Sequence, residues 1–138
     1  MPIGQATPLL APERSWQRAD GGGFWGPSLS WNTHLGAFVL LLNKVSGARA
    51  FDAEGNYITY LADIDAPAPT PRVPLRLNDL PNGPKATWYV QALGDPAMRG
   101  TSALTGQDAR LFLSDRSTLL LHFERAPGAA ADPVRRER

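Results

Sequence analysis

The sequence contains no cysteine, and its 14 basic and 13 acidic residues nearly cancel, to a net charge of +1. Without cysteine the chain has no disulfide framework, no reactive thiol and no thiolate metal site. The balanced charge argues against a nucleic-acid surface built on bulk charge. Only two histidines are present, so a metal site is not expected, and no glycine-rich phosphate loop or serine nucleophile elbow occurs. We therefore expect no metal, no cofactor and no nucleic-acid partner.

Long apolar segments and helical periodicity are also missing. No apolar stretch approaches the length of a membrane span, and no basic segment leads into an apolar run near residue 1. We expect neither a membrane span nor a secretory signal, and the sequence leaves the compartment unknown. No window places apolar residues three and four apart for several turns. The 13 glycines and 13 prolines instead favour turns and short strands.

What the sequence does contain is a series of short strand patterns. Residues 26–43 indicate two strands joined by a tight turn, with small polar residues on the first strand and an apolar run on the second. The pattern of an inner strand, a connection and an apolar strand returns after residue 87. Strands are expected near residues 27–32, 37–44, 56–62, 87–93, 109–114 and 118–124, with an edge strand at 72–77 that carries Pro74 and a further short strand near 15–18.

These patterns predict an all-β chain of about two antiparallel β-propeller blades, a partial propeller, with a small β-sandwich as the alternative. Residues 1–24 form a Pro- and Gly-rich leader, 25–80 the first blade, 81–125 a second, partial blade, and 126–138 a disordered tail. Residues 100–106 are expected to be a Gly- and Thr-rich connection.

Several motifs carry a family resemblance over about residues 15 to 125. They are Trp25-Gly26-Pro27-Ser28, Trp31-Asn32, Leu35, Leu42-Asn43, Glu54-Gly55-Asn56-Tyr57, Trp88-Tyr89-Val90-Gln91 and residues 105–112. In their order and spacing they resemble blades of the five-bladed propellers related to glycoside hydrolase family forty-three, the arabinanase and β-xylosidase type. Where such relatives tend to have proline after the Trp-Tyr pair, this chain has Val90.

The resemblance implies a fragment without catalytic groups. A propeller of this type needs about five blades, so we expect a C-terminal portion that contributes carbohydrate pocket wall and structural closure and is inactive alone. The alternative is a noncatalytic β module that binds a glycan or a protein partner. Expected partners are a carbohydrate and either the missing blades or further copies of the chain, because open blades leave apolar faces uncovered.

Eight residues are candidates for ligand binding, and none is a candidate catalyst. Tryptophans can stack on sugar rings or pack between blades, and small polar side chains can bind ligand hydroxyls or satisfy the backbone at a turn. Glu54 is the acid that a pocket would use, although a solvated turn is the favoured explanation. The set comprises Trp25, Ser28, Ser30, Trp31, Asn32, Glu54, Tyr89 and Gln91.

Overall fold

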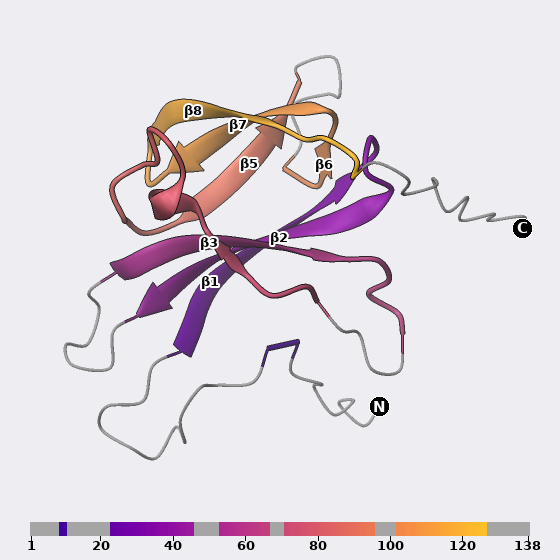
Figure 1. Cartoon of the computed structure of the whole chain (residues 1–138), viewed down its shortest axis with the longest axis horizontal. Coiled ribbons are helices and arrows are strands. Elements are labelled where there is room, and N and C mark those ends of the chain that lie inside the picture. Colours follow the sequence, from indigo (N-terminus) through magenta and orange to yellow (C-terminus); the bar gives the residue numbers. More distant parts are fainter. Residues whose placement is uncertain (1–8, 11–22, 46–52, 67–70, 96–101, 127–138) are drawn as a thin grey trace, which may run out of the picture.

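A computed structural model describes residues 9–10, 23–45, 53–66, 71–95 and 102–126 (Figure 1). This part of the chain is all-β, as expected, and its only helical element is one 3₁₀ turn, η1 (Leu77–Asp79). The strands are β1 (Gly23–Asn32), β2 (Ala37–Val45), β3 (Ala53–Leu61), β4 (Leu75–Arg76), β5 (Val90–Gly94), β6 (Leu104–Thr105), β7 (Asp108–Leu113) and β8 (Arg116–His122).

The strands form two sheets. The larger sheet has the order β4-β3-β2-β1-β6, in which β1 to β4 are an antiparallel meander and β6 runs parallel to β1. The smaller sheet is antiparallel, with the order β5-β7-β8. In Figure 1 the smaller sheet (β5, β7 and β8, in salmon to yellow) lies across one face of the purple strands β1 to β3 of the larger sheet. The result is a curled, mixed half-barrel.

One hydrophobic core joins the two sheets. The apolar run of β2 is buried, and its alternate residues Val39 and Leu41 face the smaller sheet. The other members come from both sheets, from η1 and from the residue that follows β8: Ile58, Leu77, Val90, Ala92, Ala109, Leu111, Leu113 and Phe123. Full burial of each large aliphatic side chain contributes roughly 1.5–3 kcal/mol. The expected units 25–80 and 81–125 therefore share one core, and β6, from the second unit, pairs with β1 of the first. A blade arrangement stays a prediction.

Most expected strands are present, with shifted ends. The expected strand at 87–93 begins only at Val90, because Thr87 bonds to side chains and Tyr89 has a positive φ of 55°. The expected edge strand at 72–77 shrinks to the two residues of β4. The connection expected at 100–106 contains the two-residue strand β6, which was not among the expected strands. The expected strand at 15–18 lies outside the described residues, as does the tail beyond Ala126, and the last two leader residues belong to β1.

A bulge in β1 resets which residues share a face. The register shifts between Trp25 and Ser28, at the positive-φ Gly26 and at Pro27, which has no backbone donor. Trp25 pairs with Asn43, and Ser28 pairs with Leu41. Because directly paired residues point to the same side of a sheet, Trp25 lies on the face that meets the smaller sheet.

The turn after η1 requires glycine at one position. A Cβ at Gly83 would lie 2.6 Å from the backbone oxygens of both Leu77 and Asn78, and the Gly83 amide donates to Leu80 O at 2.7 Å. We expect Gly83→Ala to lower the free energy of unfolding by about 1–3 kcal/mol, because the clashing atoms are backbone and cannot move aside. Gly23→Ala is the matched control, since nothing lies within 4 Å of the added Cβ. Urea denaturation measures both, and equal stability of the two variants would contradict this geometry.

Candidate functional site

Two tryptophans from distant parts of the chain meet at the surface. The rings of Trp25, on β1, and Trp88, just before β5, lie 6.4 Å apart between centroids at an interplanar angle of 69°, an edge-to-face contact. Trp25 is 53% exposed, and Tyr89, next to Trp88 in the chain, is 73% exposed. We call Trp25, Trp88 and Tyr89 the aromatic surface. Exposed flat apolar rings match the C–H face of a sugar ring.

The backbone at Tyr89 is held in an unfavourable conformation. Its φ of 55° is uncommon for a residue other than glycine and costs of order 1–3 kcal/mol. On either side the chain is fixed by hydrogen bonds, since Ser114 N donates to Trp88 O at 2.9 Å and Val90 pairs with Leu113. The surrounding contacts thus impose the conformation that presents the Tyr89 side chain to solvent.

A cluster of buried asparagines attaches the segment before β5, residues 80–89, to the larger sheet. Asn43 and Asn56 are directly paired between β2 and β3 and are 0% exposed. Both donate from Nδ2 to Thr87 O, at 2.6 and 2.7 Å, and Thr87 N donates back to Asn56 Oδ1 at 3.3 Å. Asn78 donates to Pro84 O at 2.8 Å and accepts from Asn56 N at 2.7 Å. These bonds fix the position of Trp88.

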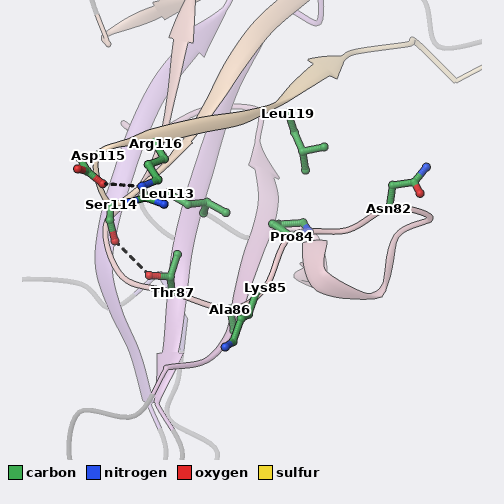
Figure 2. A pocket seen from close by; sticks show the side chains of 10 residues that line it. All are labelled: Asn82, Pro84, Lys85, Ala86, Thr87, Leu113, Ser114, Asp115, Arg116 and Leu119. Atoms are coloured by element: carbon green, nitrogen blue, oxygen red, sulfur yellow. Dashed lines mark hydrogen bonds and ion pairs between the residues drawn. The ribbon is translucent and has the colours of Figure 1, made fainter.

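The same segment forms one wall of an open pocket of about 680 Å³ (Figure 2). Opposite it lie residues of the β7–β8 hairpin, and the hydroxyls of Thr87 and Ser114 meet at 3.1 Å. Most of the exposed lining area is apolar, although six of the ten lining residues are polar or charged; the charged side chains are Lys85, Asp115 and Arg116. The complete lining is Asn82, Pro84, Lys85, Ala86, Thr87, Leu113, Ser114, Asp115, Arg116 and Leu119.

The small polar residues of β1 point into the protein. Asn32 is 0% exposed; its Nδ2 donates to Thr105 Oγ1 at 3.2 Å and Gly106 O at 2.8 Å, and its Oδ1 accepts from Leu35 N. Ser30 is 4% exposed and lies 3.5 Å from the same Thr105 hydroxyl. Ser28 is half-buried opposite Leu41. Bonds to β6 therefore account for the polarity of Ser30 and Asn32 without a ligand.

The remaining three candidates have other partners. Trp31 is on the opposite face from Trp25, half-buried with its ring 4.9 Å from that of Phe38. Gln91 pairs with Phe112 in the smaller sheet. Glu54 forms an ion pair with Lys44 at 3.6 Å. Of the eight candidates, Trp25 and Tyr89 belong to the aromatic surface. Trp88 and Thr87 were missed as site residues, because nothing in their spacing shows that Trp88 reaches Trp25.

The acidic groups do not form a hydrolytic pair at the pocket. Glycosidases use two carboxyl groups about 5–5.5 Å or 6.5–9.5 Å apart, whereas the pocket lining contains a single acid, Asp115. Elsewhere, His122 Nδ1 lies 2.7 Å from Asp108 Oδ1 on the exposed side of β7 and β8. The hydrogen bond to Asp108 raises the pKa of His122. This pair bridges two neighbouring strands.

Among the described residues, no three His, Cys, Asp or Glu side chains lie close enough together to hold a metal ion. Within those same ranges, no helix has the length and apolar character needed to cross a membrane.

The asparagine cluster makes a prediction about stability. Asn56→Val removes the partner of Thr87 N, and a buried donor without a partner costs about 1–3 kcal/mol. We expect the free energy of unfolding to fall by about that amount in urea denaturation at an unchanged m value. Lys85→Val, an exposed change in the same segment, is the control and should stay within about 0.5 kcal/mol of the unmodified chain. Comparable losses in both variants would show that the Asn56 bonds contribute little.

Comparison with known proteins gives no relative from which a role could be carried over. No protein-family model matches the chain, and neither a curated protein nor a solved structure matches it.

Proposed function

We propose that this chain is a noncatalytic β module that binds a glycan at the aromatic surface. The observation that carries the proposal is the Trp25–Trp88 pair, in which Trp25 stays 53% exposed although it lies on the face that meets the smaller sheet. Large exposed aromatic side chains that are rigidly held are typical of recognition surfaces. Trp25 packs against a second ring, and the asparagine cluster fixes the backbone that carries that ring.

Polar groups near the rings suit a ligand with many hydroxyls. Thr87 precedes Trp88 in the chain, and Ser114 Oγ lies 3.1 Å from Thr87 Oγ1 and 3.3 Å from Trp88 O. Binding sites commonly combine apolar surface with a few placed polar groups that fix orientation. The adjacent pocket supplies further apolar surface along the same segment. This combination favours a sugar over a strongly charged ligand.

Replacement of Trp25 tests the proposal. We expect the chain to bind xylohexaose or arabinohexaose, and Trp25→Ala to weaken that binding at least tenfold, because the exposed stacking surface is lost. Isothermal titration calorimetry measures the affinities. Trp31→Phe is the matched control: this tryptophan lies on the opposite sheet face, and phenylalanine keeps an aromatic ring against Phe38. No binding by the unmodified chain at millimolar sugar, or an equal loss in the control, would refute the proposal.

A second candidate is the C-terminal portion of a glycoside-hydrolase-like β-propeller, in which this chain supplies pocket wall and closure. It is favoured by the antiparallel meander of β1 to β4, the strand sequence of a propeller blade. A specific difference is β6, which pairs with the edge of β1 that would line a propeller channel. On this proposal the partners are the missing blades or further copies of the chain.

Both candidates predict that the chain alone does not hydrolyse glycosides. We expect no release of nitrophenol from p-nitrophenyl arabinofuranoside or xylopyranoside above the background of the denatured chain. The reason is that the described pocket contains one acid, whereas the reaction uses two. Turnover that disappears in Glu54→Gln would assign the chemistry to Glu54 and would contradict the noncatalytic role.

A further inference from the structure

Asn43 occupies an unusual position between the two sheets. It pairs directly with Trp25 across β1 and β2, and its Nδ2 donates at 2.6 Å to the carbonyl of Thr87, the residue before Trp88. The Asn43 amide thus bonds to the backbone next to Trp88, and Asn43 lies directly opposite Trp25 in the larger sheet. The side chain is 0% exposed, so these contacts are made in a dry environment.

The Asn43 amide also lacks one of the hydrogen bonds that a buried amide normally makes. Among the described residues, Asn43 Oδ1 has no hydrogen-bond partner, and it lies 3.3 Å from the place where a Cβ on Gly26 would be. A buried polar atom without a partner destabilises the folded state. The bond that Asn43 makes is partly duplicated, because Asn56 donates to the same Thr87 oxygen at 2.7 Å. For stability alone, an apolar side chain would serve at this position about as well.

We propose that Asn43 is a positioning residue that holds Trp25 and Trp88 in their edge-to-face arrangement and so prepares the aromatic surface for its ligand. The expected effect of Asn43 on sugar affinity rests on the glycan-binding function proposed above; its effect on the two rings does not. The physical argument is preorganisation: rings fixed before binding do not lose conformational freedom on binding. Asn56 has a different role, because it is bonded to both Thr87 N and Thr87 O and anchors the segment itself.

The test compares Asn43→Val with Asn56→Val, two changes at directly paired strand positions that share one acceptor. Near-UV circular dichroism reports the coupling of the two indole rings, with Trp25→Phe as the reference for its loss. We expect Asn43→Val to lose that signal and to bind xylohexaose or arabinohexaose at least tenfold more weakly, with a urea midpoint close to that of the unmodified chain. Asn56→Val should lower the midpoint clearly.

The outcomes separate the two proposals. An unchanged tryptophan signal in Asn43→Val, or a fall in midpoint as large as that of Asn56→Val, would overturn the positioning role. If the signal is lost while the unmodified chain binds neither sugar, the positioning role stands and the glycan-binding function fails. A lost signal with unchanged sugar affinity would show that the ring arrangement does not serve binding, which would also overturn the proposal.

Discussion

The placement of the smaller sheet against the larger one depends on the hydrogen bonds to the carbonyl of Thr87. Two buried amides, from Asn43 and Asn56, converge on that single oxygen and attach the segment before β5 to the larger sheet. In a dry environment an unpaired carbonyl is costly, so the segment has one strongly preferred position. That position sets where β5 begins, how the smaller sheet lies across the core, and where Trp88 meets Trp25.

The aromatic surface is therefore built by parts of the chain that belong to different sheets. Trp25 comes from the first strand of the larger sheet, while Trp88 and Tyr89 lead into the smaller one. Burial of the shared apolar core holds the two sheets together. It does not fix their relative position closely, because apolar burial has no preferred direction. Directional bonds from the asparagines supply the missing alignment. We infer that the buried asparagines hold the residues of the aromatic surface in their arrangement.

The polar residues of β1 illustrate how one pattern has two physical explanations. Small polar side chains beside an apolar strand are typical of a strand that lines a channel, and that interpretation led to the prediction of Ser30 and Asn32 as ligand contacts. In the structure the same side chains meet β6, where Thr105 and the Gly106 carbonyl receive their hydrogen bonds. A two-residue strand from a distant loop leaves almost no periodicity in the sequence, so this partner could not be anticipated.

The sequence by itself determined the all-β class and the approximate place of most strands, because alternation and turn residues act locally: the short apolar run of Phe38 to Leu42, directly after a turn, indicates a buried strand. It also indicated Trp25 and Tyr89 as candidate contacts. Tertiary structure alone decided which face each residue occupies. The bulge at Gly26 and Pro27 moves Trp25 to the face opposite Trp31. Strict alternation would have kept both on one face. It likewise decided the pairing of Trp25 with Trp88, since contacts between distant segments depend on how the sheets pack and leave no local pattern.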